Sequence, residues 1–497
     1  MLSPLDNRLN PLLLRELRQL VRNRYIIVLI NLFVAVLVFA CVLTVLFSNG
    51  PRGPLNNAVG GGLFAALTGI VGVACFLAVV VYTAIGTASE RINGDLMFAS
   101  ALKPSQIVLG KFFSGIILTF LLMSITFPFV TLAYLLRGLD FQMVMISFVT
   151  TFLSIQVMNA MAIFVFSNVK SYVQMFVGII NAGFLCMMGL QAVGAMFFAV
   201  SYSGHLGTTT VGGPFVSMVL VQCSLLAILL AAAIASVTPP TANRLLPVRI
   251  VVTVVFLLSL AYCTFVFGAL PEIFQGWVVS WSCALIPLLV LVVCERETWT
   301  YRIKKTIPHN FVFRILVFPF YTGSPCGLVW IFLLFGGIAL AAANGGILVV
   351  PFSDDLGEGL LALLSAFNYC VTAMLLRSFV FPKVSPGKTW AVAVVLLLFF
   401  TFGSILTYYL TYGGKDFDFG DGYSEHFLSA LNPFLLAGHD QTYRTIAAIG
   451  WAILLIFPFI FWFGLRIREF TPSPPSDMVT LEDAVAAVKY ADENPLR

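Results

Sequence analysis

One short segment resembles the end of a phosphate-binding loop. Residues 386–389 read Pro-Gly-Lys-Thr, and the Gly-Lys-Thr part is the usual end of such a loop. The glycine that should stand five positions before Gly387 is replaced by Pro382, so the phosphate cradle is incomplete. We therefore expect no nucleotide-binding site in this chain, and no ATP or other cofactor bound by it.

Metal-binding patterns are equally incomplete. Asp416, Asp418 and Asp421 approach the spacing of a calcium loop, but the third acid is one position late and the twelfth position is Phe427. The motif His-Glu-x-x-His is absent, and the cysteines lie within or beside long apolar runs, far from histidines. The sequence predicts neither a metal centre nor catalytic residues.

The elements that would position any chemistry are transmembrane helices. Hydrophobic residues make up 60% of the 497-residue chain and charged residues only 10%, against roughly 25% charged in soluble domains. Apolar runs of about 20 residues are long enough to cross a bilayer as helices. We predict an all-α bundle of about twelve spans, at residues 26–47, 63–86, 112–136, 142–166, 173–200, 215–237, 250–270, 277–294, 326–349, 357–376, 390–410 and 445–464.

The basic residues predict which side of the membrane each loop faces, because cytoplasmic loops are enriched in Lys and Arg. With the N-terminus inside, 23 of the 27 Lys and Arg residues fall on the inner side. The four that fall outside are Arg52, Arg137, Lys415 and Arg444. Both chain ends are therefore expected in the cytoplasm, and the net charge of +5 reflects topology and not nucleic-acid binding.

The middle of each predicted span contains no Asp, Glu, Lys, Arg or His. A carrier driven by protons or sodium usually needs such groups at depth. Polar residues such as Gln156, Asn159 and Gln222 do occur there, and we interpret them as helix-packing groups.

The N-terminal segment from Asn10 to Arg22 has the pattern of an interfacial helix. Asn10 is a plausible cap and Pro11 suits the first helical position. Arg15, Arg18 and Arg22 share one face, and leucines share the other, so residues 1–25 are predicted to form an amphipathic elbow on the inner surface.

The first large inward loop, residues 87–111, follows the second span. It contains Glu90, Arg91, Gly94 and Leu96, then Pro104, and ends in Gly110-Lys111 at the third span. The chain resembles the permease subunits of type-2 ABC exporters, mainly over residues 8–130, because an arginine-rich elbow, two spans and a loop of this composition follow one another in the same order. Asp95 departs from that pattern, standing where a small or hydroxyl residue is expected.

The resemblance implies a role for this loop and a partner for the chain. In that family the loop forms a coupling helix that docks on a separate ATPase subunit, which binds the ATP. Glu90, Arg91, Gly94, Leu96 and Pro104 would then contact that ATPase.

The domain organisation exceeds the simple six-span family pattern. Residues 26–237 would form a six-span permease-like domain, residues 238–468 a second six-span domain, and residues 469–497 a cytoplasmic tail. The second domain could be a fused partner, while a homodimer or a separate second permease remains open.

These observations favour the membrane subunit of an exporter in the cytoplasmic membrane of a bacterium, without enzymatic activity of its own. A twelve-span secondary transporter is the first alternative. The second is a membrane enzyme acting on lipid through His205, His426, His439 and Asp440, although these form no recognised catalytic group.

Overall fold

The computed structural model describes residues 11–48, 58–84, 86–87, 103–135, 141–167, 208–239, 242–267, 271–344, 354–412 and 441–472. These residues contain helices and connecting turns, with no strand among them. The chain divides into two compact units, Met1–Pro239 and Pro240–Arg497. The predicted boundary between the two membrane domains falls after residue 237. Each unit is described by itself below.

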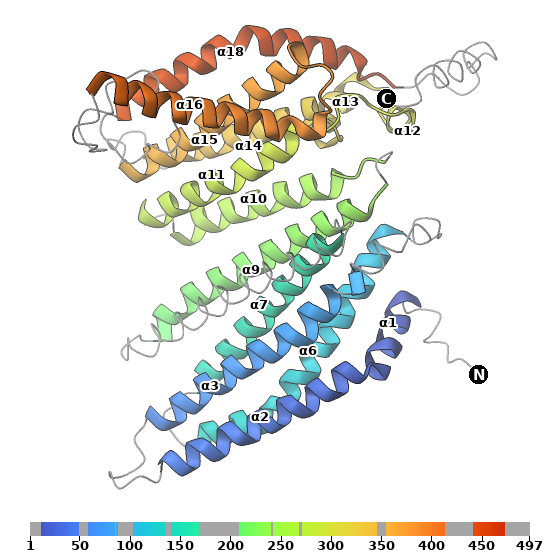
Figure 1. Ribbon diagram of the computed structural model, residues 1–497, viewed down its shortest axis with the longest axis vertical. Coiled ribbons are helices and arrows are strands. Elements are labelled where there is room, and N and C mark those ends of the chain that lie inside the picture. The colour runs from blue at the N-terminus through green and yellow to red at the C-terminus, as the bar shows by residue number, and fades with distance from the viewer. Residues whose placement is uncertain are drawn as a thin grey trace, which may run out of the picture. The chain divides into compact units, whose positions relative to one another are not determined.

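The first unit is a bundle of long helices preceded by a short one (Figure 1). Its elements are α1 (Pro11–Arg22), α2 (Arg24–Ser48), α3 (Ala58–Cys75) with the π-helical continuation η1 (Phe76–Val80), α6 (Pro104–Leu135), α7 (Phe141–Ser167) and α9 (Thr208–Val237). Asn23 separates α1 from α2, and its side chain caps the second helix by accepting a bond from the Tyr25 amide at 3.0 Å. The predicted elbow is therefore a distinct helix that leads directly into the first apolar helix.

The long helices of this unit bury one stripe and expose another that is just as apolar. In α2 the buried stripe includes Leu29, Phe33 and Leu37, spaced four residues apart. On the other side, Leu32 and Phe39 are more than 60% exposed. An apolar surface of this kind is stable where lipid tails replace water.

Small residues let α6 and α7 approach closely. A Cβ atom at Gly115 would lie 2.2 Å from the amide nitrogen of Asn159, so only glycine fits against this side chain. The same amide donates to the carbonyl oxygen of Phe112 at 3.3 Å. Asn159 therefore acts as a packing group between helices, the role expected for polar residues at this depth.

The second unit has the same character but more short elements. It contains α10 (Leu246–Phe267), α11 (Pro271–Val293), α12 (Tyr301–Lys304), α13 (Phe311–Val317), η2 (Phe318–Phe320), α14 (Ser324–Asn344), α15 (Asp354–Phe379), η3 (Pro386–Lys388), α16 (Thr389–Tyr412) and α18 (Gln441–Glu469). The short helices α12 and α13 lie together at one end of the long helices of this unit (Figure 1).

Within the described ranges, nine helices are long and apolar enough to cross a membrane. Shorter apolar helices cover 277–293 and 363–379, inside α11 and α15. The chain is a multi-pass membrane protein with an all-α fold. The predicted span at 173–200 lies outside the described residues, so the total of twelve spans and the cytoplasmic position of both ends stay predictions.

Candidate functional site

A buried ion pair joins the elbow to the helix that follows the first inward loop. Helix α1 packs on α6, and the Lys111 ammonium lies 3.2 Å from a carboxylate oxygen of Glu16. Both side chains are at least 90% buried, although 95 residues separate them in the chain. Because each charge neutralises the other away from water, the pair holds α1 in a defined position against α6.

The three elbow arginines take the other side of α1. Arg15, Arg18 and Arg22 are exposed, whereas Glu16 and Leu20 are buried. This arrangement puts the three arginines on the exposed side of α1. Their interfacial role stays a prediction.

The proposed coupling residues are only partly covered by the structure. Glu90, Arg91, Gly94 and Leu96 lie outside the described residues. Pro104 is the first residue of α6, a position where its missing amide hydrogen costs nothing. The Gln106 side chain accepts a bond from the Lys103 amide at 3.2 Å and so caps the same end. The loop therefore ends at a well-defined helix start, seven residues before Lys111.

The second unit contains a tighter ionic arrangement. Arg249 lies in the first turn of α10, and Glu295 follows the end of α11. One guanidinium nitrogen of Arg249 is 2.8 Å from each carboxylate oxygen of Glu295, and both side chains are at least 95% buried. The other terminal nitrogen donates to the carbonyl oxygens of Pro319 and Tyr321. Arg249 thus fastens α11 and the segment before α14 to the start of α10.

Two glycines make room for this arrangement. Gly323 has a φ of 141°, which disfavours other residues, and its amide donates to Glu295 at 2.7 Å. A Cβ atom at Gly327 would lie 2.7 Å from the Arg249 guanidinium and 2.5 Å from the Val292 side chain. The guanidinium also lies 5.9 Å from the ring centroid of Trp330. The site is shaped for one arginine in one orientation.

A second carboxylate, two positions later, binds two more helices. Glu297 pairs with Arg377 near the end of α15 and with Arg466 in the last turn of α18. Arg466 also lies 3.2 Å from Glu469. The short segment from Glu295 to Glu297 therefore joins the ends of α10, α11, α15 and α18 on the side predicted to be cytoplasmic.

Neither cluster has the arrangement of a catalytic centre. Each buried carboxylate faces at least one cation that neutralises it, which leaves no poised general base. Among the residues that the structure describes, no group of three or more His, Cys, Asp or Glu side chains could hold a metal ion. The two clusters join helices through ion pairs.

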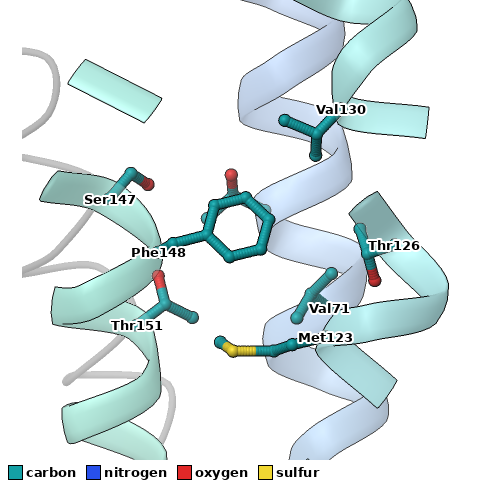
Figure 2. Close-up of a pocket in the computed structure, with 8 residues that line it drawn as sticks. Val71, Met123, Thr126, Val130, Ser147, Phe148 and Thr151 are labelled. Carbon is teal, nitrogen blue, oxygen red and sulfur yellow. The ribbon is translucent and has the colours of Figure 1, made fainter. Parts of the chain in front are cut away.

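A small cavity lies between α3, α6 and α7 of the first unit (Figure 2). It measures about 10 Å³, which is room for roughly one water molecule. The Thr126 hydroxyl donates to the carbonyl oxygen of Leu122 at 2.9 Å. The buried Thr151 hydroxyl has no hydrogen-bond partner in the part of the chain that the structure describes. A water could bond Thr151 there, but a transported molecule could not be held in this space.

Compared with known proteins, the chain matches no family model, no curated protein and no solved structure. The resemblance to type-2 ABC exporters therefore rests on the order of its sequence features alone.

Sequence reasoning missed both ionic clusters. The basic residues had been assigned to the inner side one by one, without partners. A usable signal was present, because Glu16 is an acid within an arginine-rich helix and Glu295 and Glu297 follow an apolar run directly. Which cation each carboxylate pairs with depends on tertiary packing.

Proposed function

We propose that this chain is the membrane-spanning subunit of an ABC-type exporter in the cytoplasmic membrane of a bacterium. A separate ATPase subunit would dock on the inward loop around Glu90 to Leu96 and supply the energy from ATP. The chain itself would bind no nucleotide, because its only candidate phosphate loop lacks the leading glycine at position 382.

The observation that carries this proposal is the buried pair between Glu16 and Lys111. The proposed docking loop leads into α6 at Pro104, and Lys111 lies two turns further along that helix. A displacement of the loop would therefore move α6 and the elbow helix α1 together. A membrane subunit that receives mechanical work from a cytosolic partner needs this kind of connection.

The location of the charges supports the same function. The buried Glu, Lys and Arg residues of the described segments lie in the elbow helix or within about two turns of the end of a longer helix, on the side predicted to be cytoplasmic; they are Glu16, Lys111, Arg249, Glu295, Glu297 and Arg377. A carrier driven by a proton or sodium gradient would be expected to place such groups near the middle of the membrane. This distribution favours an external energy source over the secondary-transporter alternative.

Affinity purification from native membranes tests the proposal. A tagged wild-type chain should copurify with an ATPase subunit, and the double variant Glu90→Ala/Arg91→Ala should lose most of it while remaining folded. Arg468→Ala is a matched control, since Arg468 is an exposed cation on the same predicted side. Failure of any ATPase to copurify, with transport that stops on adding an ionophore, would favour the secondary carrier instead.

A further inference from the structure

Helix α13 exposes an unusually apolar surface for so short an element. Five of its seven side chains are large, hydrophobic and between 56 and 68% exposed; they are Phe311, Val312, Phe313, Ile315 and Leu316. At about 100° per residue these five cover an arc of about 200° around the helix. Only Arg314 and Val317 occupy the remaining side. We refer to the five exposed residues as the apolar arc.

The apolar arc is held in place from both ends. Before its start, the chain is anchored by the buried Ile307, and the Asn310 side chain caps the helix by accepting a bond from the Val312 amide at 3.2 Å. At its end, Phe318 and Tyr321 are buried in a cluster with Trp299, Ile303, Ile307, Cys326 and Phe470. The Tyr321 hydroxyl also donates to the carbonyl oxygen of Thr306. Because the flanking residues are anchored, the arc faces outward as a fixed feature of the fold.

The charged residues nearest to α13 in the sequence are all positive. Arg302, Lys304 and Lys305 lie in and after α12, and Arg314 lies within α13. From Thr298 to Ser353 the sequence has no Asp or Glu. A surface of this charge attracts anionic groups, and each Lys or Arg close to an anionic membrane adds to the attraction.

Two features point to a lipid surface as the occupant. The arc is too wide to be covered by one facing helix, whereas the boundary between headgroups and acyl chains can surround it. The membrane is also close, since α14 starts at Ser324, seven residues after the end of α13, which limits the separation to roughly 25 Å even for extended chain.

We infer that α13 lies in the cytoplasmic leaflet, with its apolar arc among the upper acyl chains and the basic residues 302–305 on anionic headgroups. The end of α13 is connected to the loop that joins four helix ends of the second unit, because Arg249 donates to the carbonyl oxygens of Pro319 and Tyr321 and pairs with Glu295. This inference does not depend on an ATPase partner or on transport.

Photocrosslinking of the purified full-length chain tests the inference. A photoreactive benzoylphenylalanine replaces Phe313, or replaces Lys383 as the matched control, because Lys383 is exposed in another turn on the same predicted side. Each protein is reconstituted in nanodiscs that contain one part phosphatidylglycerol to three parts phosphatidylcholine. Mass spectrometry then measures lipid adducts after illumination.

Position 313 should give several times more lipid adduct than position 383, enriched in phosphatidylglycerol above its bulk share. In the Lys304→Gln/Lys305→Gln background, the adduct should persist while the phosphatidylglycerol share of the adduct falls to about its bulk share of the lipid. Equal lipid adducts at the two positions would overturn the membrane contact. A phosphatidylglycerol share equal to the bulk in the wild-type background would overturn the role of the lysines, and crosslinking of position 313 mainly to protein would assign the arc to a protein partner.

Discussion

The carboxylate of Glu16 and the ammonium of Lys111 meet at 3.2 Å in a buried contact between α1 and α6. The first residue belongs to the elbow and the second to the helix that follows the inward loop. If the loop receives force from a partner, this pair is where the force reaches a second element.

Breaking this pair from one side should destabilise the first unit. Lys111→Met leaves the Glu16 carboxylate buried without its partner, at an expected cost of about 3–5 kcal/mol. The double variant Glu16→Leu/Lys111→Met removes both charges and should recover most of the loss. Thermal unfolding of the detergent-solubilised variants measures both effects. A double variant as unstable as Lys111→Met would show that the charges do not act as a pair.

The same reasoning applies to the second unit with a matched control. Glu295→Gln removes the charge that neutralises the buried Arg249 and should also cost about 3–5 kcal/mol. Arg244→Gln changes an exposed cation only five positions away and should leave the melting temperature nearly unchanged. Comparable losses in the two variants would contradict the assignment of Glu295 as a buried anchor.

Glu297 has two partners of unequal exposure. Arg377 is about 95% buried, whereas a quarter of the Arg466 side chain is exposed and Arg466 also contacts Glu469. Arg377→Met should therefore lower the melting temperature more than Arg466→Met does, because burial weakens solvent screening. A larger drop in melting temperature for Arg466→Met than for Arg377→Met would mean that Glu297 is stabilised mainly by its partner on α18.

The contact between α6 and α7 predicts a strict glycine. Gly115→Ala places a methyl group against the Asn159 amide and should cost about 1–3 kcal/mol through overpacking. Gly69→Ala is the control, since no atom lies within 4 Å of the position that its methyl group would take. Asn159→Ala introduced together with Gly115→Ala should remove the clash and restore most of the lost stability. If the double variant is as unstable as Gly115→Ala, the loss does not come from the contact with Asn159.

Much of the fold was predictable because apolar runs of membrane length leave the backbone little choice but helix. The elbow was predictable for a related reason, since α1 starts at Pro11 as predicted and Arg15, Arg18 and Arg22 share one face. Hydropathy could not predict which charges meet. The distance from Arg249 to Glu295 depends on the packing of α10 on α11, and the fit of Arg249 depends on Gly323 just before α14 and on Gly327 in its first turn.

The most direct test of the account is photocrosslinking from the inward loop in intact cells. A photoreactive benzoylphenylalanine at Asn93, between Glu90 and Leu96, should yield one main adduct whose mass equals this chain plus an ATPase subunit. The same residue at Ser385, in a different predicted inward turn, should yield little of that adduct. If position 93 gives no ATPase adduct while the chain remains folded in the membrane, the proposed coupling through this loop is wrong.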